Sequence, residues 1–142
     1  MSPPAVHVQL TLLPGEYAVC RLAPGDDPGP LPAVGDAAAV YSLTLTRSET
    51  SVVCPVEQAP AAAAEVERGW RTFEVAGPMA FTLTGVLAGI TAPLAERGVP
   101  VFAVSTYDTD YLLVQEDTLP GAVAALRAAG HTVSGEEPAA GP

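Results

Sequence analysis

The order of predicted elements in the C-terminal half constrains the fold of this chain more than any other feature. Runs of β-branched and aromatic residues predict four short strands, at residues 81–83, 99–104, 111–115 and 131–133. Apolar residues at helical spacing predict two helices between them, at residues 84–97 and 119–129. The resulting order, β-α-β-β-α-β, is the split βαβ pattern of ferredoxin-like folds. We therefore expect an α+β fold.

Local signals place the ends of both predicted helices. Gly98 and Gly130 follow the last helical residues and favour termination, because glycine readily adopts the left-handed conformation there. Thr118 is a suitable N-cap for the second helix, and Pro120 is tolerated in its first turn. Pro93 lies inside the first helix, so we expect a kink or a break at that point.

The N-terminal half repeats the same order imperfectly. At one constant offset, identical or similar residues coincide: Thr46 with Thr106, Pro60 with Pro120, Thr72 with Thr132, and Glu57 with Asp117. Residues 45–54 match 105–114 as strand, polar turn and strand, so a helix at 61–68 and a strand at 70–75 are expected to follow. The first helix is degraded, because residues 24–32 contain four prolines and two glycines.

Two halves follow from this repeat, one at residues 1–76 and the other at 77–142, with Gly77-Pro78 as the boundary. The linker is too short to separate them, so we expect two ferredoxin-like halves packed side by side. An extra strand at 6–13 is expected to form a hairpin with the strand at 17–22 through Pro14-Gly15. The acidic, small-residue tail from about residue 135 is expected to be disordered.

Composition and charge argue against several classes of function. The net charge is −10, and the six arginines are scattered with no lysine beside them, which disfavours nucleic-acid binding. No run reaches the roughly 18 apolar residues of a membrane span, and the N-terminus lacks the regions of a signal peptide. We expect a cytoplasmic protein without a membrane partner, with Cys20 and Cys54 as buried thiols.

The residues needed for catalysis or metal binding are not arranged in any known pattern. The sequence has no glycine-rich phosphate loop, and no cysteine or histidine pair has metal-ligand spacing. His7 and His131 stand in strand-like contexts without a carboxylate or cysteine nearby, and Cys54 has no adjacent base. We therefore expect no enzyme, no cofactor and no metal.

The polar segment at residues 105–110 is the most distinctive part of the chain. Hydroxyl and carboxylate groups gather there between two strands, and the simplest interpretation is a solvated hairpin turn. The alternative is a site for a free amino acid, whose α-ammonium needs a carboxylate and whose α-carboxylate needs backbone N–H groups. Gly85 and Val86 open the first helix and are placed to supply such N–H groups, because glycine allows close approach to the backbone.

Two segments of the C-terminal half carry a family resemblance, FTLTGVLAGI at residues 81–90 and VFAVSTYDTDYLLV at 101–114. RSETSVVCP at 47–55 and GWR at 69–71 extend it to the N-terminal half. Over residues 6–134 the chain resembles small bacterial ACT-domain proteins related to the CASTOR-type arginine sensors. The resemblance implies two ACT-like halves with a βαββαβ order and a ligand-binding role.

The resemblance also implies which residues contact the ligand. Turn positions Thr106, Tyr107, Thr109 and Asp110 match contacts in the family, with Asp110 taking the α-ammonium, and Ser51 and Val52 match the opposing contact. Gly85 and Val86 match more loosely. The expected function is reversible binding of a free amino acid by a non-catalytic, homodimeric regulatory protein. The main alternative is an oligomerisation or protein-interaction module with a vestigial ligand site, and an enzyme ranks third.

Overall fold

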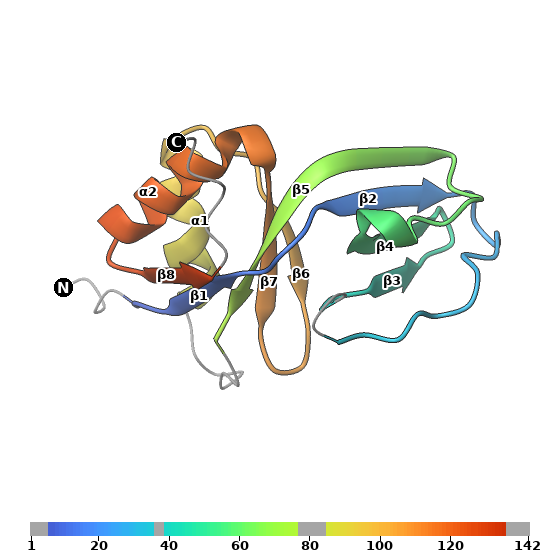
Figure 1. The fold of residues 1–142 in the computed structure, drawn as a ribbon, viewed down its shortest axis with the longest axis horizontal. Helices are drawn as coiled ribbons and strands as arrows, with labels where there is room; N and C mark the ends of the chain where they lie inside the picture. The colour runs from blue at the N-terminus through green and yellow to red at the C-terminus, as the bar shows by residue number, and fades with distance from the viewer. Residues whose placement is uncertain (1–5, 36–38, 77–84, 136–142) are drawn as a thin grey trace. The chain divides into compact units, whose positions relative to one another are not determined.

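The structure is a computed structural model that describes residues 6–35, 39–76 and 85–135 (Figure 1). Its first strands are β1 (Gln9–Leu12), β2 (Tyr17–Leu22), β3 (Ser42–Leu45), β4 (Thr50–Pro55) and β5 (Glu65–Val75), with a 3₁₀ turn η1 (Val56–Gln58) after β4. The remaining elements are α1 (Val86–Glu96), β6 (Phe102–Ser105), β7 (Asp110–Gln115), the 3₁₀ turn η2 (Glu116–Thr118), α2 (Leu119–Ala128) and β8 (Thr132–Gly135).

The chain divides into two compact units. The helical unit comprises Met1–Leu13 and Arg71–Pro142, and the strand unit comprises Pro14–Trp70. Strand β5 contributes its first residues to the strand unit and its last part, from Arg71 to Val75, to the helical unit. The division thus differs from the boundary expected after residue 76, while the proposed boundary dipeptide Gly77-Pro78 lies outside the described residues.

The sheet of the helical unit has the strand order β8-β1-β5-β7-β6. Its elements β5, α1, β6, β7, α2 and β8 follow the expected β-α-β-β-α-β order, which confirms the ferredoxin-like fold class. Strand β1 is inserted between β8, to which it is parallel, and β5, to which it is antiparallel. Figure 1 shows both helices next to β1 and β8. The first strand expected at 81–83 lies outside the described residues, and the last part of β5 occupies that place in the order.

The pairing of β1 corrects one expectation from the sequence. Strands β1 and β2 do not form a hairpin through Pro14-Gly15, because β1 pairs with β5 and β8, and β2 pairs with β4 and β5. Strand β8 also extends further than expected. Its last residues, Ser134 and Gly135, pair with Thr11 and Leu12, so the expected disordered tail begins no earlier than 136, outside the described residues.

Apolar side chains on both helices close the core of the helical unit. Val86, Ile90 and Leu94 recur at every fourth position along α1 and are buried, and α2 buries Leu119 and Leu126 among others. These side chains pack in one cluster with residues of β1, β5, β7 and β8. Ile90 is fully buried. The helices are therefore held by burial against the sheet.

Helix α1 continues through Pro93 without the expected break. Proline has no N–H, so the carbonyl of Gly89, one helical turn earlier, lacks its helical partner. The ring of His131 takes this place, since its Nε2 lies 2.8 Å from the Gly89 oxygen. His131 Nδ1 accepts from the N–H of Val8, which assigns the ring hydrogen to Nε2. A side chain distant in the sequence thus satisfies the carbonyl that Pro93 leaves free.

Both helices end at the glycines expected from the sequence. Gly98 and Gly130 have φ angles of +70° and +96°, in the left-handed region. The N–H of Val99 donates to Leu94 O, and that of His131 donates to Leu126 O, which closes the same C-terminal motif on each helix. Thr118 precedes α2 but its hydroxyl donates to Gln115 O, so it does not cap the helix with its side chain.

The strand unit has the order β3-β4-β2-β5. Read from the edge strand β6 and without the inserted β1, the helical unit has the corresponding order β6-β7-β5-β8. No α-helix occurs in its described residues, 14–35 and 39–70. Its core consists of buried residues from β2 and β4 with partly buried neighbours. Cys20 and Cys54 are both buried there, as expected, and both are free thiols.

The constant offset of the repeat is visible in the bounds of the elements. Strands β3 and β4 and turn η1 begin at residues 42, 50 and 56, and β6, β7 and η2 begin at 102, 110 and 116. The repeat then ends, because residues 61–64 form a turn and β5 begins at Glu65, so the helix expected at 61–68 is not formed. The buried Leu119, Val123 and Leu126 of α2 correspond to Ala59, Ala63 and Val66. These smaller residues offer a helix little apolar area to bury.

Candidate functional site

The turn between β6 and β7 is closed by a compact set of hydrogen bonds. The N–H of Thr106 donates to Thr109 O at 2.8 Å. The Thr106 hydroxyl donates to the same oxygen at 3.1 Å and accepts from the Thr109 N–H at 3.3 Å. This side chain thus repeats the backbone bond of the turn, a common role of threonine at such positions. Thr106 is therefore engaged within the turn.

Thr109 fixes the turn to the neighbouring strand. Its side chain is buried, and its hydroxyl donates to Val75 O, the last residue of β5, at 2.7 Å. The turn consequently lies at the end of β5, where the chain continues toward α1. With its hydroxyl engaged in this bond, Thr109 has a clear structural role, and its contact with a ligand stays a prediction.

Asp110 begins β7 and is a half-buried residue, but the hydrogen bond of its carboxylate is exposed to solvent. Its Oδ1 accepts a hydrogen bond of 2.5 Å from the hydroxyl of Ser105, the residue opposite it in the β6–β7 pair. Among the described residues, the ion pairs do not include Asp110. A carboxylate held by one neutral donor retains capacity to accept from a cationic group.

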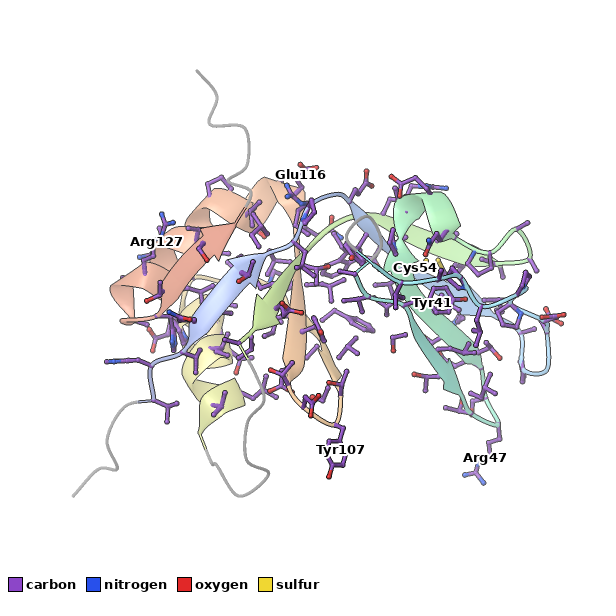
Figure 2. All side chains as sticks on the ribbon, turned by 60° about the horizontal axis from the view of Figure 1, so that its bottom comes forward. Tyr41, Arg47, Cys54, Tyr107, Glu116 and Arg127 are labelled. Carbon is purple, nitrogen blue, oxygen red and sulfur yellow. The ribbon has the colours of Figure 1, made fainter. Side chains whose placement is uncertain are left out.

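Tyr107 occupies the tip of the turn. It is 81% exposed and points away from the hairpin (Figure 2). The second tyrosine of this segment, Tyr111, behaves differently, because its hydroxyl bonds to the Glu74 carboxylate at 3.0 Å. Thus Tyr107 is placed to reach a partner outside the hairpin, while Tyr111 ties β7 to β5.

Gly85 and Val86 lie at the N-terminus of α1. Gly85 has a φ of +81°, which favours glycine, and its carbonyl accepts the first helical bond, from Gly89, at 2.8 Å. The Val86 side chain is buried in the core of the helical unit. Only backbone groups are therefore available to a ligand at Val86.

Ser51 and Val52 lie in the middle of the strand unit's sheet, on β4. Ser51 pairs with Arg21 of β2 and Thr44 of β3, and its side chain is half-buried. Val52 is fully buried in the core of this unit. Its side chain has a packing role, and the predicted ligand contacts of both residues stay predictions.

The buried thiols are poor nucleophiles. Burial is the main cause that raises the pKa of Cys54 to about 12, with the neighbouring Cys20 as a further cause. Burial also raises the pKa of Cys20. Because the thiolate is the reactive form, both groups are unreactive near neutral pH. Among the described residues, there is no cluster of three or more metal-ligating side chains.

Comparison with known proteins identifies a domain within the chain. The sequence profile of the ACT domain matches residues 65–128. The crystal structure of protein Atu0741 from Agobacterium tumefaciens is 34% identical, with 94% of this chain and 97% of that chain covered and a TM-score of 0.80. The chain therefore carries an ACT domain over residues 65–128.

More distant structures share the fold of this ACT-domain protein. The regulatory subunit of aspartate kinase from Thermus thermophilus, in its ligand-free form, matches with a TM-score of 0.60 and 12% identity over 89% of this chain and 99% of that one. Protein VC0802 of unknown function from Vibrio cholerae matches with a TM-score of 0.60 and 18% identity, covering 86% and 89%. At these identities the likeness concerns the fold alone.

Sequence reasoning missed some polar side chains. Ser105, which holds Asp110, stood out only as part of a polar run. Arg71 is buried, and its Nη1 lies 3.7 Å from the carboxylate of Glu116. Glu116, labelled in Figure 2, directly follows β7, whereas Asp110 is the first residue of that strand. Its Nε has no hydrogen-bond partner among the described residues. Trp70 and Phe73, which lie close to Arg71 along β5, were the available signal of its burial. Among the described helices, none is long and apolar enough to span a bilayer.

Proposed function

We propose that this ACT-domain protein is a non-catalytic regulatory protein that binds a free amino acid at the β6–β7 turn. The observation that carries the proposal is the Asp110 carboxylate, which has one neutral hydrogen-bond donor and no ion-pair partner among the described residues. A carboxylate with spare acceptor capacity favours a cation as its next partner, because a charge-assisted hydrogen bond is stronger than a neutral one. The α-ammonium of an amino acid supplies that cation.

The surroundings of Asp110 support this assignment. Thr106 and Thr109 hold the turn rigidly against the end of β5, so the carboxylate is positioned before a ligand arrives. The backbone N–H groups of Gly85 and Val86 begin a helix of 11 residues and would receive a carboxylate. Tyr107, at the exposed tip of the turn, is proposed to cover the ligand. Ser51 and Val52 remain the proposed opposing contact.

The ACT domain at residues 65–128 and a fold like that of an aspartate kinase regulatory subunit support a regulatory role. We keep the relation to the CASTOR-type arginine sensors as part of the proposal. The protein is proposed to act in the cytoplasm as a homodimer, because the edge strands β3 and β6 offer unpaired backbone groups to a second copy. The alternative function is an oligomerisation or protein-interaction module whose ligand site is vestigial.

A thermal-shift screen with the standard L-amino acids separates these two functions. A ligand present at 100 times its dissociation constant stabilises the folded state by about 2.7 kcal/mol. We expect one amino acid, or a few related ones, to raise the melting temperature in proportion to the logarithm of concentration. If the melting temperature is unchanged with every amino acid at millimolar concentration, the vestigial-site alternative is correct. Isothermal calorimetry then measures the affinity of each positive compound.

A further inference from the structure

A pocket lies within the strand unit, apart from the β6–β7 turn. Its volume is about 290 Å³, and it is lined by residues at the end of β2, in the β3–β4 turn and just before β5: Arg21, Leu22, Pro24, Ser48, Glu49 and Ala64. This volume is just below the usual range of roughly 300–1,000 Å³ for small-molecule sites. A pocket of this size suits a ligand of a few heavy atoms better than a nucleotide.

The position of this pocket corresponds to that of the Asp110 turn. The Thr46 N–H donates to Glu49 O at 2.9 Å, and its hydroxyl bonds to the same oxygen at 3.0 Å and accepts from the Glu49 N–H at 3.0 Å. These bonds repeat, at the same offset along the chain, the bonds between Thr106 and Thr109. Each turn lies beside the end of the strand that begins its copy of the repeat, which is β2 in the strand unit and β5 in the helical unit. The repeat therefore places the pocket where the helical unit has its candidate site.

The two places differ in the segment after the first strand. After β5 the helical unit has α1, whose side chains pack onto its sheet, whereas the described residues after β2 contain no helix. The chain turns immediately instead, with the Asp26 N–H bonded to Ala23 O. We attribute the open pocket at the end of β2 to the lack of a covering helix in this proline-rich segment.

The lining of the pocket contains one positively charged and one negatively charged residue, Arg21 and Glu49. Arg21 forms an ion pair with Glu65, but both side chains are more than half exposed, and such pairs contribute little to stability. Arg21 has further N–H donors for a second carboxylate. The Glu49 carboxylate is in a half-buried residue and has no hydrogen bond or ion pair with the described residues. Arg21 and Glu49 thus contribute one cationic and one anionic residue to a lining that otherwise consists mainly of small and apolar residues.

We propose that this pocket is a second ligand site, which binds a small zwitterion with a short apolar side chain, such as a small free amino acid. Arg21 binds the ligand's carboxylate, and Glu49 binds its ammonium. The Ser48 hydroxyl is a further hydrogen-bonding group, and Leu22, Pro24 and Ala64 contact the side chain. The site does not require the Asp110 site, since all its residues belong to the strand unit.

The test is a titration of the ¹⁵N-labelled protein with L-alanine, followed by backbone amide shifts. We expect saturable shifts at Leu22, Ser48, Glu49 and Ala64, with a dissociation constant of about 1 mM or tighter. Arg21→Gln and Glu49→Gln should each weaken these shifts about tenfold or more, because a hydrogen bond to a charged group is lost. N-acetyl-L-alanine and L-alaninamide, which each lack one charge, should bind similarly weakly.

Matched variants distinguish binding in this pocket from a general effect of charge. Arg47→Gln makes the same charge change at the tip of the β3–β4 turn, where the side chain points away from the hairpin, and should leave the shifts unchanged (Figure 2). Asp110→Asn should also leave them unchanged. If L-alanine up to about 20-fold above 1 mM shifts no residue of this pocket, or if Arg21→Gln and Arg47→Gln have equal effects, the proposal is wrong. Shifts confined to residues 105–110 would overturn it while supporting the proposed function.

Discussion

The β3–β4 and β6–β7 hairpins have equivalent bounds in the two copies of the repeat, and a threonine closes each turn with the same hydrogen bonds. The elements around them differ. The β6–β7 hairpin belongs to a unit with two helices, while the described part of the other unit has none. The comparison shows that a hairpin specified by its own local sequence keeps its geometry when the helices that accompany it are lost.

The lost helices have two physical causes. Between β2 and β3, proline removes backbone donors and clashes with the preceding helical turn, so residues 24–32 cannot be helical. Before β5 the alanines at 61–64 have a high helix propensity, but the helix would present mainly alanine side chains to the core. Pairing of Glu65 and Val66 with β2 occurs instead. Tertiary burial thus decides between helix and strand where local propensity alone favours the helix.

The largest expected difference in stability concerns the segment after β5, which contains α1, and the segment after β2. Ile90→Ala in α1 should lower the free energy of unfolding by about 2–5 kcal/mol, because removing a fully buried side chain leaves a cavity. Leu31→Ala, in the segment after β2, should change it by less than about 0.5 kcal/mol, since Leu31 is 69% exposed. Urea unfolding measures both. Equal losses would mean that the two segments contribute equally to packing, against this comparison.

The bond between His131 and the carbonyl of Gly89 predicts a coupling to Pro93. His131→Leu should cost about 1–3 kcal/mol, because Gly89 O and the Val8 N–H each lose a partner. In a Pro93→Ala background the new N–H can bond to Gly89 O, so the same substitution should cost about 1 kcal/mol less. A double-mutant cycle by urea unfolding measures this coupling. Strict additivity would show that His131 does not replace the missing helical bond.

Alkaline pH should lower the free energy of unfolding through a buried cysteine in the core of the strand unit, whereas the corresponding residue in the core of the helical unit does not ionise. Cys54 and Val114 are both fully buried, but only the cysteine ionises. Burial raises the pKa of Cys54 to about 12 in the folded protein, whereas the thiol of the unfolded chain keeps its ordinary pKa of 9.0 and therefore loses its proton first as pH rises. Stability is therefore fully present below about pH 8 and falls by up to about 1.4 kcal/mol per pH unit above about pH 9.

The control for this effect is Cys54→Val, which copies the residue of the other unit. It should make the decline in stability between about pH 9 and 10.5 shallower by about 1 kcal/mol per pH unit at most, measured by urea unfolding. A decline remains, because burial also raises the pKa of Cys20, Tyr17 and Tyr41. An unchanged slope in the variant would contradict the raised pKa of Cys54.

The smallest expected effect tests the likeness of the two turns directly. Thr46→Val and Thr106→Val each remove a hydroxyl that bonds within its turn, and each should cost about 0.5–1.5 kcal/mol. The two losses should agree within about 0.5 kcal/mol if the turns are equivalent. Thermal unfolding of both variants under one condition gives the comparison. A large loss for one and none for the other would break the equivalence.

Much of this architecture was predictable because its signals are local. The glycines at 98 and 130 end their helices as expected, and the repeat located both hairpins. The pairing of β1 with β5 and β8 was not predictable, since a strand's own pattern does not specify partners that are distant in the sequence. Pro93 suggested a kink or a break, because the side chain that compensates for it, His131, is also distant in the sequence and could not be foreseen.

The candidate site was predictable to a similar extent. Its polar residues and their place in a turn were evident from the sequence. Which of these side chains is engaged in a structural hydrogen bond depends on distances that the sequence does not give. The hydroxyl of Thr109 is bonded to Val75 O, while the Asp110 carboxylate accepts from Ser105 alone within the part of the chain that the structure describes. The pocket at Arg21 and Glu49 was not predicted, because it arises where a covering helix is lacking and two segments meet that are well separated in the sequence.

Calorimetry of the Asp110→Asn protein tests the central claim most directly, with the amino acid that gives the largest thermal shift. The substitution keeps the shape of the side chain but removes its charge, so affinity should fall about tenfold or more while the melting temperature without ligand hardly changes. Asp108→Asn, earlier in the same turn, is the control and should bind as the unmodified protein does. Equal affinities of the Asp110→Asn and unmodified proteins would contradict the assignment of the ammonium site.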